Sequence, residues 1–340
     1  MGHRGLNETK HMPYGPEQER TILLNVPWPR RCHPEAEKHV DDAFQAMVSF
    51  GAIDGDDIRE AARVKAFARL NPYVYAYASA ERLRIVATLT HWLFLLDDQF
   101  DDYAEFGKDL AAVEALMRRS LAILSSGDLP LEPTGLDRFT IYSRSLMRSV
   151  MTDDEFGHLL EDVRDYLFLG SLVAAEHWAA GRVPSAKDYA AARVHDSGAL
   201  LVMHMIRIAG GVHLPRSVLN HQAVHLASDF AVQHISFVND IVSYHKEIVV
   251  NKGLWNLVHS KMVTEDRSYE DAMFAAVNIA NHCVSAFQDA ERSLPNWDTK
   301  IDADVRTYFS GMKTWMRGNV DFAAEGKRYH LPGMVLHSIG

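Results

Sequence analysis

The chain has 340 residues, of which 47% are hydrophobic and 24% are charged, a composition typical of globular rather than disordered proteins. Its formal net charge of −10 argues against the basic surface of nucleic-acid and membrane-surface binders, so we expect neither partner. An acidic protein can still bind an anionic substrate if metal ions supply positive charge at the site.

The N-terminal residues 1–20 are polar and lack the apolar core of a signal peptide, and we expect a flexible segment there. The most apolar run, residues 199–212, is interrupted by a histidine and an arginine and is too short to span a bilayer. The two cysteines, Cys32 and Cys283, are far apart and lack metal-ligand spacing. We therefore expect no disulfide framework and a cytoplasmic location.

Helical periodicity of apolar residues dominates the rest of the chain. The first stretch, residues 35–49, has Val40, Phe44 and Met47 spaced by four and three. No period-2 pattern predicts a strand, and glycines and prolines separate the helical stretches. About ten helices with short connections predict an all-α fold, with residues 21–340 in one α-helical domain. The other predicted helices cover roughly 57–69, 73–102, 109–125, 136–149, 153–180, 186–209, 216–250, 268–293 and 301–325.

The first motif with chemical character is the run DDQFDD at residues 97–102, which ends an apolar helix. Asp97 and Asp101 share one helix face, as do Asp98 and Asp102. Four carboxylates within six residues repel one another, and the dipole of the helix C-terminus adds to the cost. Oxygen ligands of this kind suit Mg²⁺. Taken alone, the motif fits a magnesium site and a solvated acidic helix end equally well.

A second motif, NDIVSYHKE, occupies residues 239–247. On a helix, Asn239, Ser243 and Glu247 would stack along one face over about two turns. An amide, a hydroxyl and a carboxylate together offer a hard-cation site of low charge, and Lys246 beside them could reach a phosphate oxygen. The preceding residues read as a buried helix, from which polar oxygens emerge only if they have partners. This pattern argues against an incidental polar stripe.

Asp-Asp-x-x-Asp on one helix, followed by Asn-Asp-x-x-Ser-x-x-Lys-Glu on a later one, resembles the class I terpene synthases of bacteria and fungi, of the sesquiterpene cyclase type. The resemblance implies a single-domain helical bundle around a central apolar cavity. It also implies three Mg²⁺ ions, two at the aspartate-rich motif and one held by Asn239, Ser243 and Glu247. Asp97 is the firmer ligand of the first motif, because family members use either the Asp101 or the Asp102 position as the second.

The resemblance extends to segments that would bind the diphosphate. Arg193 lies 46 residues before Asn239 and is similar to the family's diphosphate-sensing arginine. Asp196 and Ser197 hold the linker and effector positions at an implied helix break. The family often has glycine as effector, acting through its backbone carbonyl, so serine is compatible. The pair at the C-terminal end that would hydrogen-bond the diphosphate is Arg328-Tyr329, and Lys246 adds a further donor.

Two aromatic residues are candidates for the cavity wall. Phe94 lies three residues before Asp97 on the same helix face. Phe322 stands where the family commonly has tryptophan, six residues before its Arg-Tyr pair, which preserves an aromatic face but changes the cavity volume. Aromatic faces stabilise cations by roughly 0.5–2 kcal/mol each.

The activity implied is Mg²⁺-dependent ionisation of a prenyl diphosphate, most commonly farnesyl diphosphate, and cyclisation to a sesquiterpene hydrocarbon or alcohol with release of diphosphate. Geranyl or geranylgeranyl diphosphate, giving mono- or diterpenes, stays open, as does a monomer or a homodimer. A chain-elongating prenyltransferase carries two aspartate-rich motifs, whereas the second motif here has Asn, Ser and Glu. A non-catalytic helical scaffold should have lost some of these motif residues, and none is lost.

One further spacing could imitate a zinc site. His221, His225 and Asp229 follow one another at intervals of four, but the segment lacks the catalytic glutamate of a metalloprotease. A surface helix face is the simpler interpretation.

Overall fold

The computed structural model of the chain describes residues 20–101, 109–325 and 334–339. Most of this part is helical, so the all-α fold class predicted from the sequence is confirmed. Two segments, η1 and η2, are π-helical, and two are short strands. In chain order the elements are β1 (Arg20–Asn25), α1 (Ala36–Ser49), α2 (Ile58–Ala68), α3 (Asn71–Val74), α4 (Ala80–Asp101), α5 (Leu110–Ser126), α6 (Gly135–Val150), α7 (Asp153–Asp165), η1 (Tyr166–Ser171), α8 (Leu172–Ala179), α9 (Ala186–Asp196), α10 (Ala199–Gly210), α11 (Arg216–Leu219), α12 (Gln222–Tyr244), η2 (His245–Val250), α13 (Leu257–Thr264), α14 (Tyr269–Arg292), α15 (Thr299–Glu325) and β2 (Met334–Ile339).

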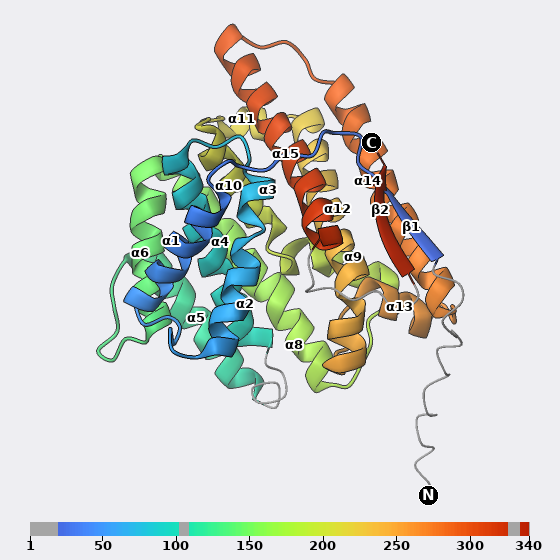
Figure 1. The fold of residues 1–340 in the computed structure, drawn as a ribbon, viewed down its shortest axis with the longest axis horizontal. Coiled ribbons are helices and arrows are strands. Elements are labelled where there is room, and N and C mark those ends of the chain that lie inside the picture. The colour runs from blue at the N-terminus through green and yellow to red at the C-terminus, as the bar shows by residue number, and fades with distance from the viewer. Residues whose placement is uncertain (1–19, 102–108, 326–333, 340) are drawn as a thin grey trace, which may run out of the picture.

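The helices pack around α12, which contacts α9, α10, α13, α14 and α15. In Figure 1, α1, α5 and α6 lie on one side of the molecule and α13 and α14 on the other. Residues 201–209 of α10 are all buried, and this helix packs against α4 and α15. Gly311 of α15 permits a close approach, because a Cβ there would lie 2.4 Å from the Ile206 side chain of α10.

Several helix starts are set by polar side chains that hydrophobic periodicity does not reveal. Ser79 accepts a backbone N–H at 3.3 Å at the start of α4, so the helix predicted over 73–102 is divided into α3 and α4. His221 accepts one at 3.3 Å and caps α12 inside the helix predicted over 216–250. Asn256 does the same at 2.9 Å for α13, which was not predicted.

The absence of strands was predicted wrongly. β1 and β2 form a two-stranded parallel sheet, which Figure 1 shows beside α14. This sheet joins a segment near the start of the chain to one near its end. Its register pairs Arg20 with Met334 and continues residue by residue to Asn25 with Ile339.

The sheet is fixed to the bundle through one face of β1. Ile22 and Leu24 are fully buried, whereas Leu23 between them is 46% exposed, which is the alternation of a half-buried strand. Asn281 of α14 donates to the Leu23 carbonyl at 3.0 Å and accepts the Asn25 amide N–H at 2.8 Å. Three alternating residues are too few to stand out in a sequence dominated by helical periodicity.

In the described ranges, no helix is both long and apolar enough to cross a membrane. Cys32 and Cys283 are both free thiols. Cys32 is exposed and Cys283 is buried, and burial raises the pKa of the Cys283 thiol to about 12. Cys283 therefore packs as a small apolar side chain of α14.

His234 is buried in α12 without a hydrogen-bond partner for either ring nitrogen, and burial lowers its pKa from 6.5 to about 3. Because the folded state resists protonating this ring, stability should fall as the pH drops below 6.5, by up to about 1.4 kcal/mol per pH unit. We expect His234→Leu to remove this contribution. Urea unfolding of both proteins at pH 7 and pH 5 should show the difference in unfolding free energy growing by roughly 2 kcal/mol in favour of the variant. All other titrating groups cancel in this comparison, and a difference independent of pH would contradict it.

Candidate active site

One cavity of ≈ 580 Å³ brings together most of the residues that the sequence singled out. Its wall is built from α2, α4, η1, α8, α9, α10, α12, η2 and α15 and from the loop that follows η2. Asp97 and Glu247, which are far apart in sequence, both line it. The predicted site residues in its lining are Phe94, Asp97, Arg193, Asp196, Ser197, Asn239, Lys246, Glu247 and Phe322.

The remaining predicted site residues lie in three kinds of place. Asp101 is the last residue of α4. Asp102, Arg328 and Tyr329 lie outside the described residues. Ser243 is 3% exposed and lies on α12 between Asn239 and η2.

Near the C-terminal end of α4, Asp97 and Asp98 have different partners. The Tyr166 hydroxyl of η1 donates to Oδ1 of Asp97 at 2.6 Å, and Asp98 forms an ion pair with Arg63 of α2. Burial raises the pKa of Asp97 to about 7, and the negative charges of Asp196 and Asp98 add to this effect. The repulsion expected along this motif is thus relieved for Asp98 by a protein cation. At Asp97 the repulsion persists, so a cation would be stabilised most strongly beside this carboxylate.

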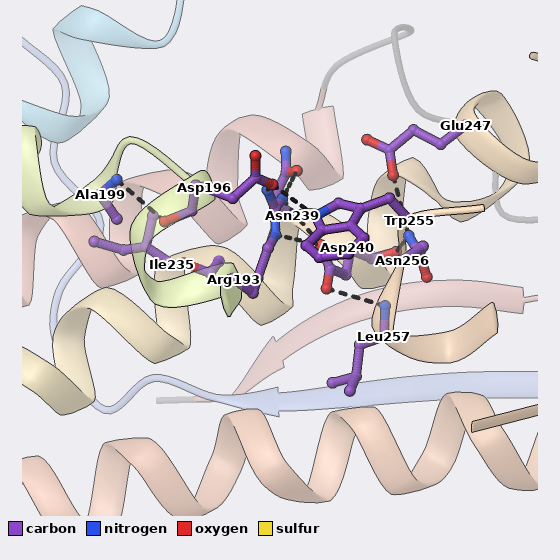
Figure 2. Close-up of polar contacts among 12 residues, drawn as sticks. Arg193, Asp196, Ala199, Ile235, Asn239, Asp240, Glu247, Trp255, Asn256 and Leu257 are labelled. Atoms are coloured by element: carbon purple, nitrogen blue, oxygen red, sulfur yellow. Dashed lines mark hydrogen bonds and ion pairs between the residues drawn. The ribbon is translucent and has the colours of Figure 1, made fainter. Parts of the chain in front are cut away.

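Also in the cavity lining, the guanidinium of Arg193 donates to three acceptors (Figure 2). Its Nε donates to Asp240 at 3.0 Å, and its two terminal nitrogens donate to Asp196 and to Oδ1 of Asn239, each at 2.9 Å. The Arg193 side chain is only 12% exposed. The residue predicted to sense the diphosphate is therefore held within the wall by the linker residue and by the second motif.

Asp240 carries the buried negative charge behind this arginine. Its carboxylate accepts the Tyr189 hydroxyl at 2.7 Å and the Leu257 amide N–H at 3.2 Å. Burial raises the pKa of Asp240 to about 6, although the charge of Arg193 opposes the change. The motif analysis assigned Asp240 no role, and its position next to Asn239 was the available signal.

The second motif does not continue as one regular helix, as the spacing of four had suggested. α12 ends at Tyr244 and η2 follows, so Glu247 stands on a wider π-helical turn. Asn256 donates from its amide nitrogen to the Glu247 carboxylate at 3.1 Å and to the Asp240 carbonyl at 2.9 Å (Figure 2). The hydroxyl of Ser243 is buried and makes no hydrogen bond. The second motif thus contains the Ser243 hydroxyl, which has no hydrogen-bond partner, and the Glu247 carboxylate, which accepts a hydrogen bond from the Asn256 amide.

The helix break implied by the resemblance is present, since α9 ends at Asp196 and α10 begins at Ala199. Gly198 forms it with a left-handed φ of 66°, a conformation that favours glycine. The Ser197 hydroxyl accepts the Ala199 amide N–H at 3.1 Å, and Asp196 accepts the Trp255 indole N–H at 2.8 Å. The effector and linker residues are therefore fixed in place by the local backbone and by the loop after η2.

The helix break after Asp196 also packs closely against η1. A Cβ at Gly170 would lie 2.4 Å from the backbone nitrogen of Asp196, so only glycine allows this approach. The sequence signal was an isolated glycine within the helical pattern over 153–180. Tyr166, the partner of Asp97, begins the same π-helical segment.

Aromatic and aliphatic side chains form the rest of the wall. Phe94 packs against Phe67 with ring centroids 4.3 Å apart, and Phe322 is 7% exposed. Trp178, Trp255 and Trp315 also line the cavity, although no cavity role was predicted for them. The lining aliphatic side chains are Leu70, Leu93, Ala174, Ala199, Val202, Met205, Ile235 and Leu254. The cavity wall thus combines charged and polar groups with apolar and aromatic side chains.

The alternative zinc spacing does not form one site. His221 caps α12 through Nδ1 and its ring packs against Trp297, whereas His225 pairs with Asp229 at 3.4 Å. Within the described residues, the groups of three that could hold a metal ion lie elsewhere.

Comparison with known proteins places these features in context. Residues 88–286 match the family model described as terpene synthase family 2, C-terminal metal binding. The 10-epi-cubebol synthase of Sorangium cellulosum is 27% identical over 314 residues, which covers 91% of this chain and 98% of that protein. The (2E,6E)-farnesyl-diphosphate-cyclizing (+)-T-muurolol synthase of Roseiflexus castenholzii is 26% identical over 294 residues, covering 86% and 89%. The crystal structure of germacradien-4-ol synthase from Streptomyces citricolor has the same fold, with a TM-score of 0.75 at 23% identity over 88% of this chain and 97% of that one.

Proposed function

The chain belongs to terpene synthase family 2, and we propose that it binds farnesyl diphosphate with three Mg²⁺ ions, ionises it and cyclises the cation to a sesquiterpene. It is a class I terpene synthase, a lyase that acts on a prenyl diphosphate, as the two sequence motifs predicted. Metal binding is a property of the family, and farnesyl diphosphate is the substrate of the Roseiflexus castenholzii relative. The observation that carries the proposal is that Asp97, Asn239 and Glu247 all line one cavity.

The residues of the second motif fit a magnesium ion. The orphaned, buried hydroxyl of Ser243 is a group that a cation would satisfy, and the Asn239 amide and the Glu247 carboxylate, four residues before and after it, offer hard oxygens in the cavity lining. At the first motif, Asp97 with either Asp101 or Asp102 would hold the remaining two ions. When bound, Mg²⁺ supplies Lewis-acid stabilisation of the charge on the leaving diphosphate.

Arg193 couples the second motif to the diphosphate. Its guanidinium now donates to Oδ1 of Asn239, the oxygen that would ligate the ion. If that oxygen ligated an ion, the Arg193 N–H would be available to donate a charge-assisted hydrogen bond to a phosphate oxygen. Because Arg193 also holds Asp196, a shift of the guanidinium would be felt at the helix break at Ser197. Lys246, Arg328 and Tyr329 would be the further diphosphate donors.

The apolar part of the hollow protects the cation after ionisation. Water would quench the cation, whereas Phe94, Phe322 and the lining tryptophans exclude water and offer π faces. We further propose one domain over residues 21–340, a monomer or homodimer, and a cytoplasmic location.

Replacing Phe322 with tryptophan should change the products more than the rate. The larger ring narrows the cavity next to the reacting chain while leaving the metal and diphosphate residues untouched. We expect total turnover within about threefold of the wild type, a barrier change below about 0.7 kcal/mol. Gas chromatography with mass spectrometry should show an altered product ratio, and an unchanged profile would remove Phe322 from the wall that shapes the cation.

The activity is tested by incubating the full chain with geranyl, farnesyl or geranylgeranyl diphosphate and Mg²⁺, followed by the same product analysis. A cyclic C15 product from farnesyl diphosphate, lost on chelation of the metal, is the expected result. Products from only the C10 or C20 substrate would reassign the substrate. A longer prenyl diphosphate formed with added isopentenyl diphosphate would indicate chain elongation instead, and binding without turnover would indicate a scaffold.

A further inference from the structure

Away from the cavity, three metal-ligating side chains meet where the connection from β1 enters α1. One ring nitrogen each of His33 and His39 and one carboxylate oxygen of Glu35 all lie within 4.8 Å of one another. The two imidazole rings stand edge to face with centroids 5.5 Å apart. None of the three residues lines the active-site cavity. In Figure 1, α1 lies on the side of the molecule away from α13 and α14.

The local backbone holds these side chains together. The His33 amide N–H donates to the Pro72 carbonyl of α3 at 2.9 Å, which fixes the connection against the bundle. Glu35 is the N-cap residue of α1, and its side chain caps no backbone N–H. His39 follows Glu35 by four residues, so the two share one helix face. The Glu35 carboxylate, which is 45% exposed, is therefore available to bind another group.

The ring of His39 is buried but has no hydrogen-bond partner. His39 is 5% exposed, and neither ring nitrogen makes a hydrogen bond. The nearest Glu35 oxygen is 3.8 Å from Nε2, beyond hydrogen-bond distance. Burial lowers the pKa of His39, and the neighbouring His33 adds to this effect. A buried polar group left without a partner calls for an explanation.

We propose that His33, Glu35 and His39 bind one Zn²⁺ ion that fastens the β1–α1 connection to the start of α1. Two imidazoles and a carboxylate form a donor set that zinc uses in proteins, with water in the open fourth position. Imidazole nitrogen favours zinc over Mg²⁺, which prefers oxygen ligands, so this site and the active site select different metals. At His33, Nδ1 accepts the Glu35 amide N–H at 3.2 Å, so the ion would take the lone pair of Nδ1 in place of that N–H, or the lone pair of Nε2 in the other ring tautomer.

A second group of two histidines and one carboxylate differs from this one in the hydrogen bonds of its histidines. His158, Asp162 and His204 also lie within 4.8 Å of one another. Both ring nitrogens of His204 are occupied there, by Asp162 and by the Arg207 guanidinium, each at 2.6 Å. A protein cation already completes that cluster. His39, by contrast, accepts no hydrogen bond from an arginine or lysine in the described part of the chain.

The full chain should be dialysed against buffers of fixed free Zn²⁺ in excess Mg²⁺, and its bound zinc measured by atomic emission. We expect the wild type to bind one more zinc ion than His39→Gln at the same free concentration. Glu35→Gln changes an exposed side chain, so it should fold, and it should bind this ion at least tenfold more weakly. Zinc should raise the melting temperature of the wild type but not of His39→Gln.

The matched control is His225→Gln, which removes an imidazole that also has a carboxylate four residues away, Asp229, but no third ligand among the described residues. This variant should bind as much zinc as the wild type. Equal zinc stoichiometry and affinity in the wild type and Glu35→Gln would overturn the proposal, as would an equal loss in His225→Gln. The measurement uses no prenyl diphosphate, so its outcome is independent of the proposed activity.

Discussion

Glu247→Gln should lower the turnover of farnesyl diphosphate by at least about 10³-fold, which corresponds to roughly 4 kcal/mol in the barrier. The substitution keeps the shape of the side chain and an oxygen that can still accept the Asn256 amide, so the fold should survive. What is lost is the negative charge at the proposed third ion. Initial rates of product formation over a range of Mg²⁺ concentrations, with circular dichroism of the folded protein, measure both effects. Part of the loss should be recovered at high Mg²⁺ if weaker metal binding is the cause.

The control is Glu265→Gln, which makes the same chemical change outside the cavity. Glu265 pairs with Lys261 at 3.2 Å and with Arg267 at 2.6 Å and does not line the cavity. Its replacement should leave turnover within about twofold of the wild type, a barrier change of about 0.4 kcal/mol. A fully active Glu247→Gln enzyme would contradict the assignment of Glu247 as a metal ligand.

Arg193→Met should cost both stability and activity, and a second substitution should separate the two. Removing the guanidinium leaves the Asp240 carboxylate buried without its cation, a change that costs roughly 3–5 kcal/mol of unfolding free energy. In Arg193→Met/Asp240→Asn the charge is gone, and the amide oxygen can still accept the Tyr189 hydroxyl and the Leu257 N–H. We expect the double variant to regain at least half of the lost stability, as measured by urea unfolding.

Activity should stay at least 10²-fold below that of the wild type in both variants, because neither has a guanidinium to offer the diphosphate. If turnover returned together with stability in the double variant, Arg193 would be a structural residue and its place in the proposed function would be withdrawn.

The two motifs could be identified from the sequence because their side chains are energetically unfavourable in a folded protein unless a ligand binds them. Adjacent carboxylates near Asp97 and polar oxygens at Asn239 and Ser243 on a buried helix conflict with ordinary packing, and such conflicts are visible in sequence. The all-α fold followed from periodicity over long segments, where the signal adds up.

What the sequence could not reveal depends on contacts between distant segments. Nothing local announces that Asn256 holds Glu247, or that Asp240 and Asn239 share one arginine. The π-helical turn at η2 shifts Glu247 relative to regular helical spacing, and π-helical turns have no simple periodicity. The strands escaped detection because each has six residues and the pairing joins opposite ends of the chain.

The parallel pairing of β1 with β2 has a mechanical consequence. If the chain is held at residue 20 and pulled at residue 339, the two parallel strands are drawn in opposite directions along their own axes. Their inter-strand hydrogen bonds then bear the load together rather than opening one after another. Single-molecule stretching between these points should meet its first resistance at this small sheet, before the helices of the bundle yield.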